Sequence, residues 1–159
     1  MTSRRLSAQA PTGEYAIPVR LTFHLNGQEI QVFSKPGLPD WREITPATAL
    51  LAEHALVSPN ARAILLGCRH GASAVILACR STRGELWIMD NSAIALSLTT
   101  ATLQANQVAN ARLSWEIDLP DDQSGAFDSA AIELPKGRKL ARRWLALAWN
   151  ALRPGGALY

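Results

Sequence analysis

Apolar and polar residues alternate over residues 18–34, and a turn-prone Asn26-Gly27 pair divides the alternation into two halves. A period of two is typical of a strand with one buried face, and Asn-Gly is a favoured two-residue turn between antiparallel strands. The pattern therefore predicts a β-hairpin over residues 18–34. Its apolar positions are Val19, Leu21, Phe23, Leu25, Ile30 and Val32.

Beyond a proline- and glycine-rich connector, the pattern changes to helices and strands in alternation. Thr45 is a suitable N-cap, and Pro46 a suitable first residue, for a helix that ends near residue 57. This alternation is typical of an α/β, doubly wound, Rossmann-like fold with a mostly parallel sheet. Further strands are expected at residues 62–66, 85–90, 111–117 and 127–134, and further helices at residues 71–80, 92–106 and 137–152.

The end of the sequence predicts a turn into a fifth strand over residues 153–159, and Tyr159 is its last residue. We therefore expect a sheet that is truncated at this strand: either the sequence is a fragment, or the gene is broken, or a second copy or a partner chain supplies the missing edge. Residues 1–13 are small and polar, and we expect a disordered leader there. The domain would then span residues 14–159, with its core over residues 45–159.

Composition narrows the class of protein. A chain of 159 residues with 48% hydrophobic and 18% charged residues is expected to form one folded domain. The net charge of +3 permits a polyanionic partner. Cys68 and Cys79 have neither metal-ligand spacing nor the setting of a disulfide framework, and we expect them to be reduced and buried. No apolar run has the length of a membrane span, so a cytoplasmic location is expected.

A glycine turn, Gly67 to Gly71, follows the first parallel strand. In sheets of this type, ligands bind beyond the carboxyl ends of the strands, where a turn meets a helix N-terminus. The G-x-x-x-G spacing matches neither the dinucleotide fingerprint nor the phosphate loop. Asp90 ends the next strand, where a carboxylate can accept hydrogen bonds from ribose hydroxyls; alternatively, it only begins the helix that Ser92 caps.

Five segments of the chain together resemble the class I S-adenosylmethionine-dependent methyltransferases. The closest resemblance is to the methyltransferase small group, which methylates guanine N2 in ribosomal RNA. The resemblance covers about residues 30–159 and implies S-adenosylmethionine as cofactor and ribosomal RNA as partner. The segments are "ITPATALLAEHA", "AILLGCRHG", "LWIMDNSAIALSLTTATLQANQ", "FDSAAIELPKGR" and "NALRPGGALY".

The resemblance also implies the residues of the cofactor site. The turn of the family reads roughly D-x-G-x-G-x-G, so Arg69 replaces the middle glycine and Leu65 stands where an acid is common. The guanidinium of Arg69 either pairs with the carboxylate of the cofactor's methionine moiety or fills the space that the cofactor needs. Asp90 matches the acid that holds the ribose, and Asp118 the position near the adenine. The implied site comprises Thr48, Gly67, Cys68, Arg69, Gly71, Asp90, Asn91 and Asp118.

The segment after the fourth strand departs from the family. Amino methyltransferases carry N-P-P-[FY] there, whereas this chain has Glu133-Leu134-Pro135-Lys136. The resemblance implies that Glu133 and Pro135 face the methyl acceptor, although the stacking aromatic is replaced. A non-catalytic module that binds RNA or a partner protein therefore remains the alternative to an enzyme.

A basic cluster follows this segment. Its location beside the expected substrate mouth favours contacts with RNA phosphates over a merely solvated helix face. His70 is expected to be a surface or packing residue, and Trp144 and Trp149 are expected in the core. The cluster comprises Lys136, Arg138, Lys139, Arg142 and Arg143, of which the first four are our expected RNA contacts.

Overall fold

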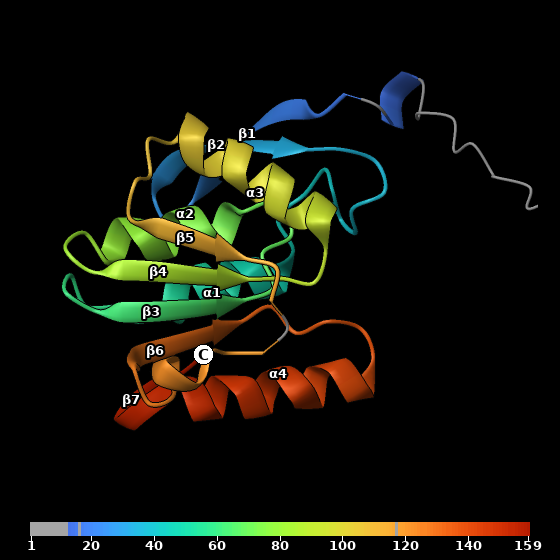
Figure 1. Ribbon diagram of the computed structural model, residues 1–159. Helices are drawn as coiled ribbons and strands as arrows, with labels where there is room; N and C mark the ends of the chain where they lie inside the picture. Colours follow the sequence, from blue (N-terminus) through green and yellow to red (C-terminus); the bar gives the residue numbers. More distant parts are fainter. Residues whose placement is uncertain (1–12, 16, 117) are drawn as a thin grey trace, which may run out of the picture.

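A parallel sheet of five strands forms the centre of the molecule (Figure 1). The computed structural model describes residues 13–15, 17–116 and 118–159, so the predicted leader lies almost wholly outside the described residues. The strand order is β5-β4-β3-β6-β7, and every neighbouring pair is parallel. The strands are β3 (Arg62–Leu66), β4 (Glu85–Met89), β5 (Ala111–Ser114), β6 (Phe127–Ile132) and β7 (Leu152–Leu158).

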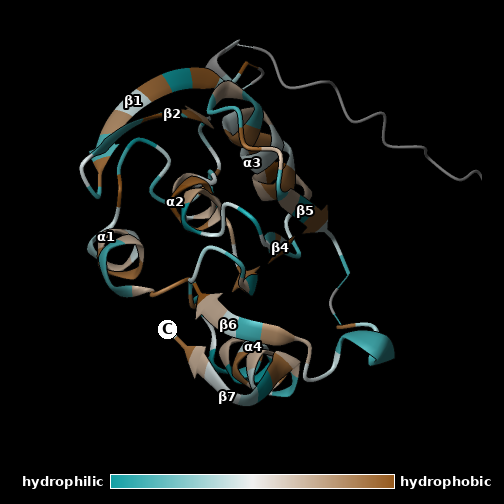
Figure 2. Cartoon of the chain, turned by 90° about the vertical axis from the view of Figure 1, so that its left-hand side faces the viewer, coloured by the Kyte–Doolittle hydropathy of each residue, from teal (hydrophilic) through white to brown (hydrophobic). Residues whose placement is uncertain are grey.

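Helices cover both faces of the sheet (Figure 2). One face carries α1 (Pro46–His54), α2 (Ala72–Arg80) and α3 (Ala93–Ala105), and the other carries α4 (Arg138–Ala151). The predicted doubly wound α/β fold is therefore confirmed. Among the described residues, no helix is long and apolar enough to cross a membrane. The described residues also include two 3₁₀ turns, η1 (Gly13–Tyr15) and η2 (Asp121–Gln123).

The predicted hairpin forms a second, antiparallel sheet of β1 (Val19–Leu25) and β2 (Gln28–Ser34). Asn26 and Gly27 both have positive φ, 52° and 73°, which is the conformation that a tight hairpin turn requires. The hairpin lies over α2 and α3, and its buried apolar side chains join the core on that side. It therefore forms an additional layer outside the helices.

Two predicted helix caps are confirmed. The Thr48 N–H donates to the Thr45 hydroxyl at 3.2 Å, and the Ala95 N–H donates to the Ser92 hydroxyl at 3.2 Å. Each bond satisfies one backbone donor that a helix N-terminus leaves without a partner. These caps fix where α1 and α3 begin, directly beside the carboxyl edge of the sheet.

Several predicted boundaries and burial states differ from the structure. The helix beginning at Pro46 ends at His54 rather than residue 57, and β5 ends at Ser114. The fifth strand begins at Leu152, because the expected turn residues form an irregularity within β7. Trp149 is 74% exposed, so its core assignment was wrong, whereas Trp144 is buried. Cys79 is exposed, and only Cys68 is buried as predicted.

Candidate functional site

A cavity of about 210 Å³ opens beyond the carboxyl ends of β3, β4 and β6. Hereafter it is called the edge pocket. The first residue after each of these strands lines it: Gly67 after β3, Asp90 after β4 and Glu133 after β6. The predicted site residues that line it are Gly67, Arg69, Asp90, Asn91, Glu133, Pro135 and Lys136.

Asp90 is held in place by backbone groups. Its Oδ2 accepts from the Cys68 N–H at 2.9 Å, and its Oδ1 accepts from the Ser92 N–H at 2.8 Å. The Cys68 thiol also donates to Oδ2, at 3.5 Å. A carboxylate oxygen accepts about two hydrogen bonds, so Oδ2 is already engaged by two donors, whereas Oδ1, with one donor, retains acceptor capacity. Burial, and then the Asp90 charge, raise the pKa of the Cys68 thiol well above its usual value, so Cys68 is an unreactive thiol.

Gly67 is required by the indole of Trp144. Its φ is +82°, and a Cβ atom added there would lie 2.6 Å from Trp144 Cζ3 and 2.8 Å from the Glu133 carbonyl oxygen. Trp144 therefore packs directly on the turn and forms one wall of the edge pocket. Gly71 has a different role: it precedes α2 at φ +86°, and a Cβ atom there would lie 3.0 Å from Thr99 Cα of α3.

Arg69 has a left-handed backbone conformation, with φ at +47°. Its Nε lies 2.7 Å from Glu133 Oε2, and its Nη1 lies 2.6 Å from Asp40 Oδ2. Asp40 belongs to the connector between β2 and α1, whose Leu38 and Pro39 also line the pocket. Arg69 thus joins this connector to the end of β6.

The Glu133 carboxylate points toward protein donors. Besides Arg69, the Thr48 hydroxyl donates to it at 3.1 Å, and the Ser73 hydroxyl donates to its other oxygen. Burial raises the pKa of Glu133 above its usual value, and the bonds from Ser73, Arg69 and Thr48 oppose that shift. Thr48, an expected cofactor residue, therefore acts on Glu133 and does not line the pocket.

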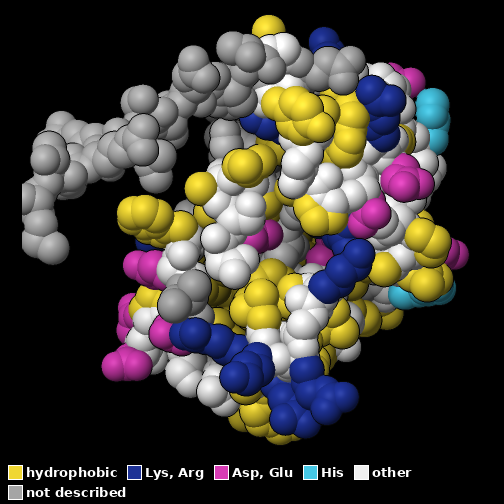
Figure 3. All heavy atoms as spheres, turned by 90° about the vertical axis from the view of Figure 1, so that its right-hand side faces the viewer, with side chains coloured by type: hydrophobic (Ala, Val, Ile, Leu, Met, Phe, Trp, Pro, Cys, Tyr) yellow, Lys and Arg dark blue, Asp and Glu magenta, His cyan; other side chains and the backbone are white. Residues whose placement is uncertain are grey.

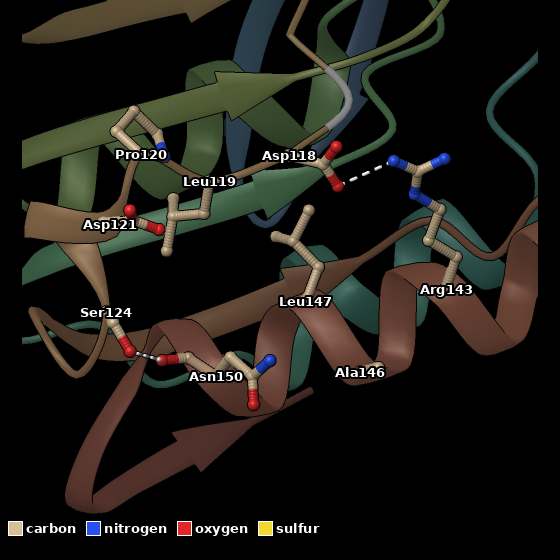
Figure 4. Close-up of a pocket in the computed structure, with 9 residues that line it drawn as sticks. All are labelled: Asp118, Leu119, Pro120, Asp121, Ser124, Arg143, Ala146, Leu147 and Asn150. Carbon is tan, nitrogen blue, oxygen red and sulfur yellow. Dashed lines mark hydrogen bonds and ion pairs between the residues drawn. The ribbon is translucent and has the colours of Figure 1, made fainter.

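Asp118 lies outside the edge pocket. It lines a neighbouring cavity of about 280 Å³ beside α4, where its Oδ1 lies 2.6 Å from Arg143 Nη2 (Figure 4). A void of about 10 Å³, lined by Asp90, Trp144 and Leu147 among others, lies between the two cavities. Asp118, the predicted adenine residue, and Asp90, the predicted ribose residue, therefore line different cavities.

The basic residues gather at the start of α4. Figure 3 shows the face onto which the strand ends open, with Lys and Arg side chains along its lower part and acidic side chains in the hollow above. The four expected RNA contacts, Lys136, Arg138, Lys139 and Arg142, are all exposed. Lys136 also lines the edge pocket, so the basic surface reaches its mouth.

Some residues around the site, from the connector and from α2, were not predicted from the sequence. Asp40 pairs with Arg69, Ser73 donates to Glu133, and Leu38 lines the edge pocket. A short-range signal existed only for Asp40, since Pro-Asp before a helix favours a turn. His70 is buried, stacks on Phe23 with ring centroids 6.2 Å apart and contacts the Glu43 carbonyl oxygen, so its packing role is confirmed.

Comparison with protein families matches residues 29–159 to the methyltransferase small domain. The chain belongs to the methyltransferase small domain family. This family uses S-adenosylmethionine as its cofactor, which confirms the cofactor and the class I methyltransferase fold implied by the sequence resemblance. No curated protein sequence matches the chain significantly.

Solved structures of similar fold include an rRNA methyltransferase and two further proteins. The 16S rRNA N2 methyltransferase RsmC of T. thermophilus, in complex with AdoMet and guanosine, has a TM-score of 0.77 at 20% identity, over 89% of this chain and 41% of its own. Trm5b from Pyrococcus abyssi has a TM-score of 0.67 at 15% identity, over 87% and 39%. P. horikoshii TYW2 in complex with MeSAdo has a TM-score of 0.65 at 12% identity, over 87% of this chain and 50% of its own. This methyltransferase small domain thus spans half or less of the length of each of these three proteins.

The edge pocket suits the nucleoside part of the family's cofactor. Asp90 presents free acceptor capacity for ribose hydroxyls, and the Trp144 indole and the Gly67 backbone offer apolar walls. At the other end of the pocket stand Arg69 and Glu133, which are paired with each other. The residues that fit the cofactor are therefore concentrated at the β4 side of the site.

Proposed function

We propose that this chain is an S-adenosylmethionine-dependent methyltransferase that acts on a guanine of ribosomal RNA in the cytoplasm. The observation that carries the proposal is the Asp90 carboxylate, which backbone donors hold at the edge pocket with acceptor capacity to spare. A buried carboxylate at this place can accept a hydrogen bond from a ribose hydroxyl. The family membership supplies the cofactor.

The proposed roles follow from the geometry. Asp90 binds the ribose, and Asn91, Gly67 and Trp144 surround the nucleoside. Cys68 acts through its N–H, which fixes Asp90, and Gly71 acts by allowing α2 to begin against α3. The bound sulfonium supplies an already activated methyl group, so the protein's task is to position the acceptor and to exclude water. Pro135 lies at the mouth where that acceptor would enter.

Two observations support ribosomal RNA as the substrate. The exposed basic residues at the start of α4 adjoin the pocket mouth, and cations there can bind RNA phosphates. The similar T. thermophilus enzyme is a 16S rRNA methyltransferase that was crystallised with guanosine. Together they favour an RNA base as the methyl acceptor.

Calorimetric titration with S-adenosylmethionine tests the proposal. We expect wild type to bind in the micromolar range and Asp90→Ala to weaken binding by about tenfold or more, because the ribose loses a charged acceptor. Asp122→Ala, an exposed carboxylate change away from the pocket, is the matched control and should bind like wild type. No binding at millimolar cofactor, or an unchanged affinity in Asp90→Ala, would contradict the proposal.

The second candidate is a non-catalytic methyltransferase-like module that binds RNA or a partner protein. The Glu133 carboxylate favours it, because Thr48, Ser73 and Arg69 donate to its two oxygens. These oxygens are therefore less available to accept a hydrogen bond from the amine that would receive the methyl group. Transfer of a labelled methyl group to small-subunit ribosomal RNA separates the two. Incorporation selects the enzyme, whereas salt-dependent RNA affinity without incorporation selects the module.

A further inference from the structure

Arg69 stands at a backbone position that favours glycine. A φ of +47° is left-handed, and residues with a side chain adopt it at an energetic cost. The turn of the family, which reads roughly D-x-G-x-G-x-G, has glycine at this position. In this chain a guanidinium lies beside the turn, so its contacts decide what else can occupy that space.

The guanidinium is held at two points. Nε meets Glu133 Oε2 at 2.7 Å, at the end of β6, and Nη1 meets Asp40 Oδ2 at 2.6 Å, in the connector before α1. Only 26% of the Arg69 side chain is exposed. Two carboxylates already compensate its charge, so a third carboxylate, brought by a ligand, would have to compete with both.

The edge pocket is small, and its β4 side and β6 side differ in their side chains. The edge pocket has about 210 Å³, below the roughly 300 to 1,000 Å³ usual for small-molecule sites. Its β4 side offers Asp90, Asn91 and Ser92, whose polar groups suit a nucleoside. Its β6 side ends at the paired Arg69 and Glu133. The opening therefore corresponds to the nucleoside and not to the amino-acid tail of S-adenosylmethionine.

We propose that Arg69 occupies the place of the cofactor's amino-acid tail, so that the edge pocket takes a tail-free adenine nucleoside more readily than S-adenosylmethionine. The inference rests on the proposed function, since it assumes that adenosine binds at Asp90. S-adenosylmethionine enters fully only when the guanidinium leaves Asp40, Glu133 or both. Arg69 is thus a specificity-determining residue for the ligand.

Calorimetry with two ligands tests this assignment. 5′-Methylthioadenosine keeps the adenosine and the sulfur of the cofactor but lacks the tail. For wild type we expect it to bind at least as tightly as S-adenosylmethionine. In Arg69→Gly, S-adenosylmethionine affinity should rise by about tenfold, because two ion contacts no longer compete, while methylthioadenosine affinity changes by less than about threefold.

Two further variants keep the test sharp. Asp40→Asn loosens only the outer contact and leaves the buried Glu133 paired, so it should raise S-adenosylmethionine affinity by a smaller factor even if Arg69→Gly folds poorly. Arg153→Gly breaks another 2.6 Å ion pair, with Asp128 at the amino ends of the strands, and should leave both affinities unchanged.

The outcomes separate this inference from the proposed function. Weaker S-adenosylmethionine binding in Arg69→Gly, with methylthioadenosine unaffected, would make Arg69 a clamp for the tail and overturn the inference while keeping the function. A wild-type preference of about tenfold for S-adenosylmethionine would do the same. Failure of every variant to bind either ligand would overturn both.

Discussion

Gly67 and Gly27 share a left-handed backbone but differ in their surroundings. At Gly67 an added Cβ atom would meet the Trp144 ring and the Glu133 carbonyl, whereas nothing lies within 4 Å of one at Gly27. Gly67→Ala should therefore lower the free energy of unfolding by about 2 to 4 kcal/mol, from strain plus overlap. Gly27→Ala should cost about 1 kcal/mol, from strain alone.

Urea unfolding of the two variants measures this difference. Equal losses would mean that the wall of the edge pocket yields easily and that Trp144 is not fixed against the turn. Because the φ values of Gly67 and Gly27, 82° and 73°, are similar, the backbone strain of an alanine should be similar at both positions. The difference between the two variants therefore measures the steric overlap of the added methyl group at Gly67.

Individual contacts were predictable from the sequence where the two partners are close along the chain. Thr45 and Ser92 cap their helices through bonds that span three residues, so the local pattern contained the full information. The Arg69 cluster joins Asp40 to Glu133 across the fold, and no local pattern encodes that meeting. The exposure of Trp149 also escaped prediction, because α4 is apolar around a wide arc.

The N-terminus of helix α4 has an unfavourable charge distribution. Gly137 gives no side-chain cap, the first turn has no acidic residue, and Arg138 and Lys139 stand at the positive end of the helix dipole. Replacing either with glutamine should raise the free energy of unfolding by about 0.3 to 1 kcal/mol. If these residues contact phosphates, the same change should weaken RNA binding and reduce the salt dependence by about one unit of slope.

RNA titrations at several salt concentrations, combined with thermal unfolding, check both effects together. Arg83→Gln is a suitable control, because Arg83 donates to Asn60 in the loop before β3, away from the pocket. More stable variants with undiminished RNA affinity would show that the basic cluster is only a solvated face. The predicted RNA contacts would then have to be withdrawn.

Most elements were predictable because their apolar patterns match their burial. Strands β3 and β4 are covered on both faces and appear in the sequence as continuous apolar runs. Element ends were less accurate, since tertiary contacts decide them. The expected Pro-Gly turn near the end of the chain is instead an irregularity that β7 accommodates while staying paired with β6.

At the scale of the molecule, the described residues form two hydrophobic cores that share one sheet. The core under α4 centres on Phe127, which is fully buried and meets Trp87 edge to face at 5.6 Å. Phe127→Ala should lower the free energy of unfolding by about 3 to 5 kcal/mol, whereas Trp149→Ala, at an exposed site on the same helix-covered side, should change it by less than about 0.5 kcal/mol.

Circular dichroism and tryptophan emission should report the Phe127→Ala transition at the same urea concentration, because both cores rest on the same strands. Separate transitions would show that the two faces unfold independently. Strand β7 forms one edge of this sheet, and its pairing with a second chain stays a prediction, as do the domain boundaries at residues 14 and 45.

The position of Trp144 makes the edge pocket observable by light. Its indole is buried, rests on Gly67 and faces the space that a nucleoside would fill. An adenine placed nearby would change the polarity around the excited ring and quench or shift its emission. The tryptophan that shapes the site therefore provides an intrinsic spectroscopic probe of its occupancy, with no label attached to the chain.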